Sequence, residues 1–216
     1  MNDSDPLITS VPDHVPLHIG LTGNIASGKS TVSRLLEQMG AARVDADQLA
    51  RDVVAPGGPA LAAIGARWPS VITSDGSLDR AALRRIVFRA PLERAALEAI
   101  THPAIGALRD AAIAAARRAG APVIVYDVPL LFEAGLEDSV DRIVLVDAPE
   151  ALRRERLQRD RGLSREEADA AIAAQMPASE KRARAHHIID NDGSEAALAE
   201  AVRQLWPLLA PSRSLD

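Results

Sequence analysis

Residues 18–31 read His18-Ile-Gly-Leu-Thr-Gly23-Asn-Ile-Ala-Ser-Gly28-Lys29-Ser30-Thr31, which fits the pattern G-x-x-x-x-G-K-[ST] directly behind an apolar run. This pattern predicts a phosphate-binding loop between a strand and a helix. The glycines let the backbone turn so that successive N–H groups face a triphosphate, while Lys29 reaches the β- and γ-phosphate oxygens and Ser30 ligates Mg²⁺. A chance match to a Gly/Ser-rich turn is the alternative, and the position where strand gives way to helix argues against it.

Lysine is scarce in this chain. Among 25 basic residues only Lys29 and Lys181 are lysines, so arginine supplies nearly every other positive charge. A compact ammonium retained at position 29 indicates that a guanidinium would not fit there.

The composition bounds the class of protein. The chain has 216 residues, enough for one sizeable core, and no apolar run approaches the roughly 18 residues that a membrane span needs. A formal net charge of −5 and 2% aromatic residues argue against a nucleic-acid surface. The absence of cysteine excludes disulfides and thiolate chemistry. We therefore expect a cytoplasmic protein, a monomer or a small homo-oligomer, with neither nucleic acid nor membrane as its partner.

Two parts are expected along the chain. Residues 1–16 are polar and acidic and contain three prolines, without a basic start or an apolar centre. They predict a disordered extension rather than a signal peptide. Residues 17–210 are expected to form a single domain.

Strand-like apolar runs recur between longer helical patterns, at 17–22, 42–44, 122–127, 142–147 and 187–190. This alternation predicts an α/β fold with a doubly wound, mostly parallel five-stranded sheet, of the type that carries phosphate-binding loops. The runs that end at Asp127 and Asp147 resemble buried central strands, whose C-terminal ends commonly carry functional side chains.

Two helical stretches interrupt the strands. Residues 56–120 are rich in Ala, Leu and Arg, with breaks at Gly57-Gly58-Pro59, Asp75-Gly76 and His102-Pro103, and predict a helical insertion on the sheet. Residues 150–175 predict a helix-turn-helix with a break at Gly162 and a capping box from Ser164 to Glu167. Its arginines suit a lid over a polyanion such as ATP.

Two carboxylates follow the second strand. Asp45 and Asp47 are two residues apart, and Arg51 lies four residues beyond the second. This spacing can present one carboxylate to a ligand and a guanidinium on the same helical face, and a phosphoryl-transfer kinase needs a base beside the acceptor hydroxyl. Simple capping of the following helix is the alternative for either carboxylate.

Asp127 ends a buried strand in the sequence Tyr126-Asp-Val-Pro129-Leu-Leu-Phe-Glu133. Enzymes with phosphate-binding loops keep a carboxylate for Mg²⁺ or its waters at such a position. An ordinary turn at the end of a strand is the alternative.

Together these clusters resemble the dephospho-CoA kinase family, from residue 17 to about residue 206. The phosphate loop is the one decisive short motif, and the ordered set is specific. The matching pieces are residues 20–31, Asp45-Ala-Asp47 with Arg51, Asp75-Gly-Ser-Leu-Asp79-Arg80, His102-Pro103, Asp127-Val-Pro-Leu-Leu-Phe-Glu133, Gln175, and Asn191 with Gly193.

The resemblance implies transfer of the γ-phosphoryl group of ATP to the ribose 3′-hydroxyl of dephospho-CoA, with Mg²⁺ as cofactor. It implies that Asp47 is the general base and that Lys29 and Arg156 contact the phosphates. The second lid arginine is either Arg159 or Arg161. The implied nucleotide-binding residues are Gly23, Ala26, Ser27, Gly28, Lys29, Ser30, Thr31 and Asn191; the implied acceptor-binding residues are Asp45, Arg51, Arg80 and His102; the implied Mg²⁺ ligands are Ser30 and Asp127.

Structural roles stay open for some of these residues. His102 precedes a proline, and any single lid arginine can belong to a solvated helix face. The adjacent residues His186 and His187 do not predict a metal site, because neighbours on a strand point to opposite faces.

The chain departs from the family pattern in four places. Glycine is usual where this chain has Asn24 and Ala26, and a side chain there tolerates a positive φ less well. The usual aromatic-Gly pair is Trp68-Pro69, and an aspartate often seen before the last strand is His186.

Two other functions compete with this interpretation. A nucleoside or nucleoside-monophosphate kinase of the same architecture differs only in its acceptor site. A GTP-dependent switch normally carries an Asn-Lys-x-Asp element, which this chain lacks because Lys29 and Lys181 are its only lysines.

Overall fold

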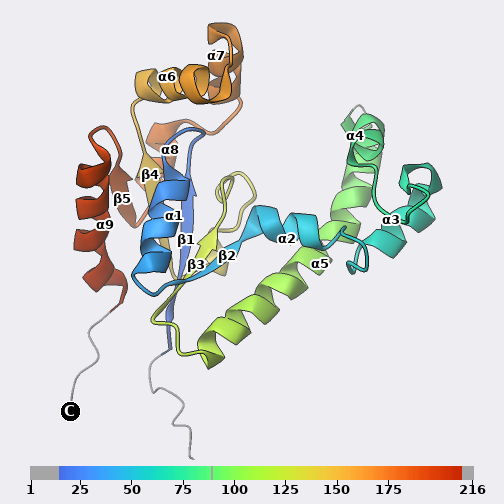
Figure 1. Cartoon of the computed structure of the whole chain (residues 1–216), viewed down its shortest axis with the longest axis horizontal. Coiled ribbons are helices and arrows are strands. Elements are labelled where there is room, and N and C mark those ends of the chain that lie inside the picture. The colour runs from blue at the N-terminus through green and yellow to red at the C-terminus, as the bar shows by residue number, and fades with distance from the viewer. Residues whose placement is uncertain (1–14, 89, 211–216) are drawn as a thin grey trace, which may run out of the picture. The chain divides into compact units, whose positions relative to one another are not determined.

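The computed structural model describes residues 15–88 and 90–210 (Figure 1). The expected disordered extension therefore falls, up to residue 14, outside the described residues.

Five strands form one sheet, in the order β2-β3-β1-β4-β5. Their bounds are β1 Leu17–Gly23, β2 Ala42–Asp45, β3 Val123–Asp127, β4 Arg142–Asp147 and β5 His187–Asp190. The pairs β1–β4 and β4–β5 are parallel, with Gly20 opposite Ile143 and Val146 opposite Ile189. Because parallel strands cannot be joined by a tight turn, crossover connections must link them, and helices supply most of these connections. The predicted α/β fold with five strands is confirmed.

Nine α-helices and two short 3-10 helices are present in the described part of the chain. The α-helices are α1 Lys29–Gln38, α2 Ala46–Asp52, α3 Leu61–Arg67, α4 Arg80–Phe88, α5 Pro91–Arg118, α6 Glu150–Arg161, α7 Arg165–Ala173, α8 Ala178–Arg184 and α9 Glu195–Leu209. The 3-10 helices are η1 Pro69–Val71 and η2 Glu137–Ser139.

The chain divides into two compact units. Among the described residues, the first unit comprises 15–43, 114–125 and 129–210, and the second comprises 44–88, 90–113 and 126–128. Each unit has its own hydrophobic core.

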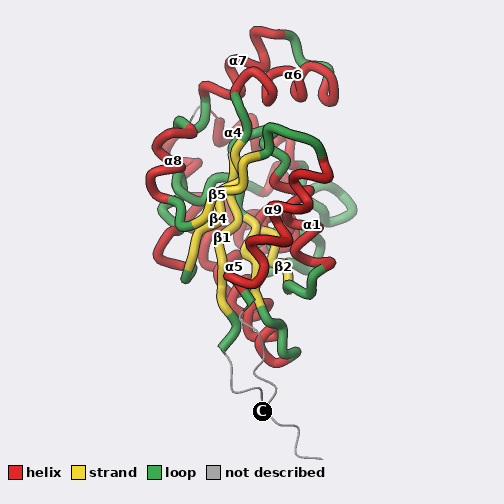
Figure 2. Tube along the Cα trace, turned by 90° about the vertical axis from the view of Figure 1, so that its left-hand side faces the viewer, coloured by secondary structure: helices red, strands yellow, loops and turns green. Residues whose placement is uncertain are grey.

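The core of the first unit lies between strands and helices that cover them. In Figure 2, α1 and α9 lie on one side of the sheet and α8 on the other. Helix α9 buries Leu198, Val202, Leu205 and Leu209, which recur every three or four residues and so share one face. This face packs with Val32 and Leu36 of α1 and with residues of β1 and β4. The packing holds the start of α1 beside the end of β1.

The core of the second unit is built almost entirely from helices. Val53, Ile64, Trp68, Val71 and Leu83 are buried at its centre, and apolar residues of α5 pack against them. Of the departure Trp68-Pro69, only Trp68 belongs to this core, and its Nε1–H donates to Glu93 Oε2 at 2.9 Å. Pro69 is exposed and begins η1.

One predicted break is wrong. The pair His102-Pro103 does not interrupt the helix, because α5 runs from Pro91 to Arg118 with Pro103 inside it. A proline in a helix removes one backbone donor and disfavours the preceding turn. Ile100, Ala104, Ile105 and Leu108 pack against the core on both sides of the proline, and this burial outweighs the local cost.

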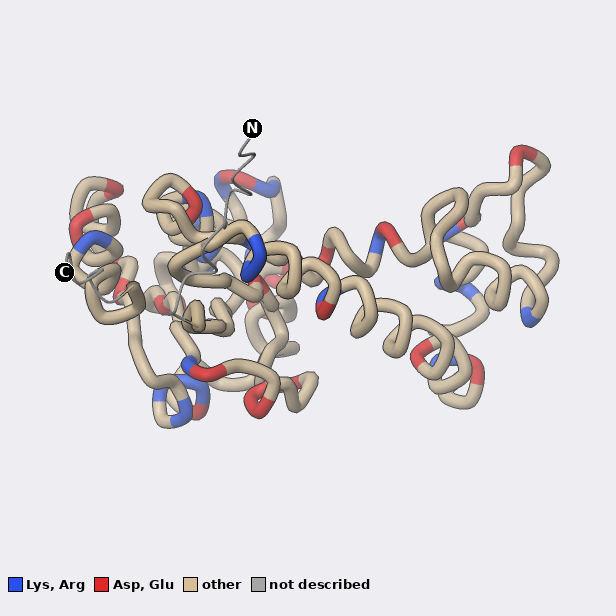
Figure 3. Tube along the Cα trace, turned by 90° about the horizontal axis from the view of Figure 1, so that it is seen from below, with Lys and Arg blue, Asp and Glu red and all other residues tan. Residues whose placement is uncertain are grey.

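Charged residues of both signs are scattered over each unit (Figure 3). None of the helices in residues 15–88 and 90–210 combines the length and apolar character required to cross a bilayer.

Candidate functional site

The phosphate loop connects β1 to α1, as predicted, and its two motif glycines meet different constraints. Gly28 has a φ of 95°, and a Cβ on it would lie 2.1 Å from Nδ2 of Asn191. Gly23 is required for space rather than for an unusual φ, because a Cβ there would lie 2.5 Å from the Val146 carbonyl oxygen and 2.6 Å from Ser27 Oγ. The contacts with Asn191 and Val146 come from segments distant in the chain, and they explain why a larger residue does not fit at either position.

Ala26 carries the unusual backbone conformation of the loop. Its φ of 60° makes it the one non-glycine residue with a positive φ among residues 15–88 and 90–210. A left-handed conformation costs an alanine about 1–2 kcal/mol, so surrounding contacts must hold it. Its carbonyl oxygen accepts a hydrogen bond from Arg156 Nη1 at 3.1 Å, and its side chain packs on the cluster of Leu157, Ala168 and Ile172.

Asn24, the other departure from glycine, has no positive φ. Its side chain is buried and Nδ2 donates to the Met176 carbonyl oxygen at 3.2 Å. The asparagine therefore ties the loop to another segment instead of supplying conformational freedom.

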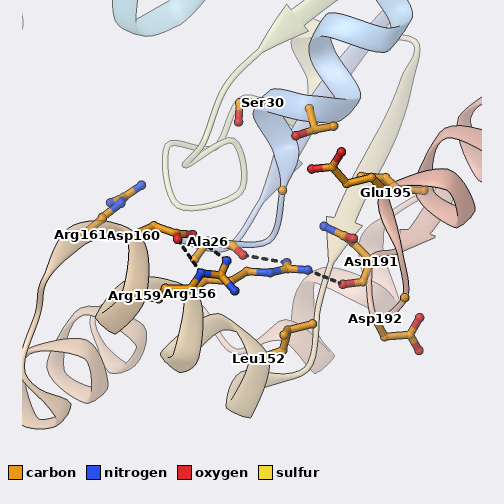
Figure 4. A pocket seen from close by; sticks show the side chains of 14 residues that line it. Ala26, Ser30, Leu152, Arg156, Arg159, Asp160, Arg161, Asn191, Asp192 and Glu195 are labelled. Carbon is orange, nitrogen blue, oxygen red and sulfur yellow. Dashed lines mark hydrogen bonds and ion pairs between the residues drawn. The ribbon is translucent and has the colours of Figure 1, made fainter.

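A cavity of about 550 Å³ opens at the phosphate loop (Figure 4). Three segments of the first unit line it: the loop and the start of α1, helix α6, and the turn between β5 and α9 with the first residues of α9. The lining residues are Ala26, Gly28, Ser30, Thr31, Leu152, Arg156, Arg159, Asp160, Arg161, Asn191, Asp192, Gly193, Glu195 and Leu198.

Six of the residues predicted for nucleotide binding or catalysis meet at this cavity: Ala26, Gly28, Ser30, Thr31, Arg156 and Asn191. Gly23, Ser27 and Lys29 belong to the same loop but are not among its lining residues. Ser27 is buried, and Lys29 is half-buried at the first position of α1.

Arg156 and Asn191 tie the three segments together. Arg156 donates to the carbonyl oxygens of Ala26 and Asn191, at 3.1 and 3.2 Å, as Figure 4 shows. Asn191 Nδ2 donates to the Ser27 carbonyl oxygen at 2.7 Å. Arg156 thus joins helix α6 to the loop, and its side chain lines the cavity.

Residues 150–175, for which a helix-turn-helix is expected, contain α6 and α7. Helix α6 ends at Gly162, whose φ is 66°, and α7 begins with the capping box of Ser164 and Glu167. Arg159 and Arg161 both line the cavity, so the ambiguity between these two arginines persists. Arg159 pairs with Asp160 at 2.7 Å, and this pairing raises the pKa of Arg159 and lowers that of Asp160.

Acidic lining residues were missed by the sequence analysis. Asp192 and Glu195 accompany Asp160 around the cavity, so acidic and basic side chains face the same space. The sequence offered one signal for them. Asp192 lies between Asn191 and Gly193, which match the family, and Glu195 follows two residues later.

The second unit contains most of the residues predicted for the acceptor. Asp45 caps α2 by accepting the Gln48 N–H at 3.0 Å, which is the local role considered as its alternative. Asp47 is exposed in the first turn of the same helix. Arg51 donates to Gln48 Oε1, and Arg80 Nη2 donates to the Arg51 carbonyl oxygen at 3.3 Å. The unit thereby brings Arg51 and Arg80 together, while His102 is exposed on α5.

Asp127 lies at the last position of β3 and is only 1% exposed. Within residues 15–88 and 90–210, no group of three or more His, Asp or Glu side chains is arranged to hold a metal ion.

At His186, Nδ1 accepts the Ile143 N–H at 3.0 Å, so this histidine serves as an acceptor for the sheet.

A glycine-bearing loop between β1 and α1, five strands in the order found here and a cavity at the loop together define a P-loop nucleotide-binding protein. A dephospho-CoA kinase family model matches residues 17–197. The chain therefore belongs to the dephospho-CoA kinase family.

Individual relatives agree with this assignment. The chain is 50% identical over 191 residues to a dephospho-CoA kinase of Geobacter sulfurreducens, covering 87% of this chain and 96% of the relative. It is 45% identical over 188 residues to a dephospho-CoA kinase of Corynebacterium jeikeium, covering 87% and 97%. A crystal structure from Thermus thermophilus is 39% identical with a TM-score of 0.77, covering 91% of this chain and 99% of that one. The predicted family and enzyme class, a kinase, are confirmed, and a nucleoside kinase is not favoured.

Proposed function

We propose that this chain phosphorylates the ribose 3′-hydroxyl of dephospho-CoA with ATP, giving coenzyme A and ADP, the final step of coenzyme A synthesis. The observation that carries the proposal is the family match over residues 17–197, which includes the phosphate loop and the residues proposed for the acceptor. The oxygen of the 3′-hydroxyl forms a bond to the γ-phosphorus while the bond from that phosphorus to the bridging oxygen of ADP breaks.

The donor half of the reaction is assigned to the first unit. Backbone N–H groups of the loop and the ammonium of Lys29 would bind the phosphates of ATP, and Arg156 would offset charge that develops during transfer. The nucleoside end would occupy the part of the cavity lined by Leu152, Asn191 and Leu198. The other loop residues proposed for nucleotide binding are Gly23, Ala26, Ser27, Gly28, Ser30 and Thr31.

Mg²⁺ is assigned to oxygen donors. The Ser30 hydroxyl lines the cavity and Asp127 ends a buried strand, and hydroxyl and carboxylate oxygens are the donors that Mg²⁺ prefers. When bound, the ion would neutralise charge on the β- and γ-phosphates. Asp127 would hold it directly or through water.

The acceptor half is assigned to the second unit. Asp47, exposed in the first turn of α2, would accept the proton that leaves the 3′-hydroxyl. Arg51, Arg80 and His102 would bind the anionic acceptor together with Asp45. The contact between Arg80 and the Arg51 backbone supports a shared role for these two side chains.

An acceptor screen tests this function. Purified protein with ATP and Mg²⁺ is offered dephospho-CoA, nucleosides and nucleoside monophosphates, and phosphorylated products are quantified. We expect dephospho-CoA to be phosphorylated far faster than the other acceptors. Comparable or better turnover of a nucleoside or nucleoside monophosphate would overturn the proposal.

We also propose that the protein acts in the cytoplasm as a monomer or small homo-oligomer, without a nucleic-acid or membrane partner. Its formal net charge of −5 supports this, because polynucleotides and anionic lipids repel an acidic protein. Light scattering after size exclusion measures the oligomeric state. Retention on DNA or on anionic vesicles would contradict the proposal.

A further inference from the structure

The phosphate loop is fastened to a segment between α7 and α8. The Ile25 N–H donates to Gln175 Oε1 at 2.7 Å, and Asn24 Nδ2 donates to the Met176 carbonyl oxygen at 3.2 Å. We call Gln175 and Met176 the loop bracket. It engages two consecutive residues of the loop from outside the residues that line the cavity.

An ion pair between the buried Lys181 and Glu133, whose side chain is 23% exposed, holds the bracket in turn. The Met176 N–H donates to Glu133 Oε1 at 3.2 Å, and Glu133 Oε1 lies 2.7 Å from Nζ of Lys181. Lys181 has no exposed surface, although it is one of only two lysines in the chain. Burial by itself raises the pKa of Glu133, but contact with Lys181 and the backbone N–H groups outweighs it, and the pKa lies below its usual value.

Burying the ammonium of Lys181 costs free energy, which its contacts must offset. Removing an ammonium from water costs several kcal/mol, and an apolar side chain of similar size could fill the same space. The charge is retained where its partner carboxylate, Glu133, also accepts a hydrogen bond from the bracket. The pair therefore fixes the position of the Met176 backbone as well as filling the core.

The loop needs such support because of its own conformation. Ala26, with a φ of 60°, follows directly after the two residues that the bracket holds. Arg156 holds the Ala26 carbonyl and Asn191 holds the Ser27 carbonyl. Four consecutive loop residues thus each have a long-range partner, and the bracket supplies the first two. A strained backbone persists only when its surroundings determine it in this way.

We infer that Gln175 and the Lys181–Glu133 pair are positioning residues for the phosphate loop: they hold it, before ATP arrives, in the conformation that receives the triphosphate. The inference rests on the proposed function in so far as the loop binds ATP, and it assigns no contact with the substrate. Without the bracket, ATP binding must include the cost of ordering the loop, so affinity falls while the chemical step changes less.

Four variants separate the parts of this arrangement. Gln175→Met removes the acceptor for the Ile25 N–H at nearly constant size, and Gln175→Glu retains an acceptor oxygen. Lys181→Met removes the buried charge, and Glu133→Gln retains an oxygen for Met176 but removes the ion pair. Leu209→Ala, in the buried α9 face of the same unit, is the control for general loss of stability.

The measurements are hydrogen exchange at the Ile25 amide without nucleotide, ATP affinity by calorimetry without acceptor, kcat, and the melting temperature. We expect Gln175→Met to lose protection at Ile25 and to weaken ATP binding about tenfold, with kcat changed about twofold at most. Gln175→Glu should retain protection at Ile25. Lys181→Met and Glu133→Gln should weaken ATP binding more than Leu209→Ala does at an equal fall in melting temperature.

Two results would overturn the inference. One is wild-type protection at Ile25 and wild-type ATP affinity in Gln175→Met; the other is equal ATP affinity in Lys181→Met and Leu209→Ala. Should Lys181→Met not fold, Glu133→Gln takes its place. Failure of the proposed function is recognised separately, since a wild-type chain that binds ATP but phosphorylates another acceptor refutes that function and leaves the bracket intact.

Discussion

The candidate residues of the two units are held in different ways. In the first unit, contacts between distant parts of the chain fix the cavity: Arg156 reaches Ala26, and Asn191 reaches Ser27. In the second unit, Asp45 and Arg51 contact Gln48 of their own helix, and Asp47 and His102 are exposed.

This difference indicates different modes of binding. Hydrogen bonds within the chain already tie helix α6 to the loop, so we expect the proposed nucleotide cavity to change little when ATP binds. Asp47 and His102, two of the residues proposed for the acceptor half, have exposed side chains that can adjust around a larger substrate. Substitutions in the first unit should therefore change nucleotide affinity or geometry, whereas those in the second should change acceptor binding and the proton transfer.

The largest effect is expected for Lys29→Arg. This change retains the charge but replaces a compact ammonium by a planar guanidinium, so kcat/KM should fall by about 10³-fold through lost phosphate geometry. Steady-state kinetics measure the fall, and Lys29→Met is the matched variant without charge. Near-normal turnover of Lys29→Arg would refute the argument from shape.

Asp47→Asn should lower kcat by about 10²-fold and leave ATP affinity nearly intact, because an amide cannot accept the proton of the 3′-hydroxyl. Kinetics and calorimetry together separate the two quantities. Asp52→Asn, on the exposed end of the same helix, is the control and should retain activity. An unchanged kcat in Asp47→Asn would remove Asp47 from the role of base.

Arg156→Leu should weaken ATP binding about tenfold, because it removes a charge and two hydrogen bonds that join the lid to the loop. Calorimetric titration with ATP measures this. Arg165→Leu, at an exposed position of α7, is the control within the lid and should bind ATP normally. Equal ATP affinities for the two variants would show that Arg156 does not contribute to ATP binding.

The smallest effect concerns Asp45. Asp45→Ala removes the N-cap of α2 and should lower the free energy of unfolding by about 1 kcal/mol, whereas Asp45→Ser retains a capping oxygen and should restore it. Chemical denaturation measures both. We expect the KM for dephospho-CoA to be raised in both Asp45→Ala and Asp45→Ser. If Asp45→Ser has the wild-type KM, capping of α2 is the only role that Asp45 needs.

Sequence patterns predicted the strands closely because each is a short apolar run bounded by turn residues. The run expected at 142–147 is β4 without change, and that at 187–190 is β5. Pro103 shows the limit of such reasoning. Proline disfavours a helix locally, but α5 continues through Pro103 because residues on both sides of it are packed against the core.

For the candidate site, the motif identified the loop but not its support. Asn24 and Ala26 are the two loop positions that depart from glycine, and the structure gives each a distinct role: Asn24 forms a long-range hydrogen bond and Ala26 adopts a positive φ. Gln175 was noticed only through the family resemblance. Nothing in the local sequence connects it to Ile25, because the two are 150 residues apart.

The two lysines show what each level of description determined. For Lys29, the sequence alone indicated a phosphate-binding role, because the motif is contiguous and its chemistry depends on spacing along the chain. For Lys181, scarcity of lysine made the residue conspicuous without indicating a partner. Only the tertiary structure brings it to Glu133 and buries it, because burial and long-range pairing depend on how separate segments pack.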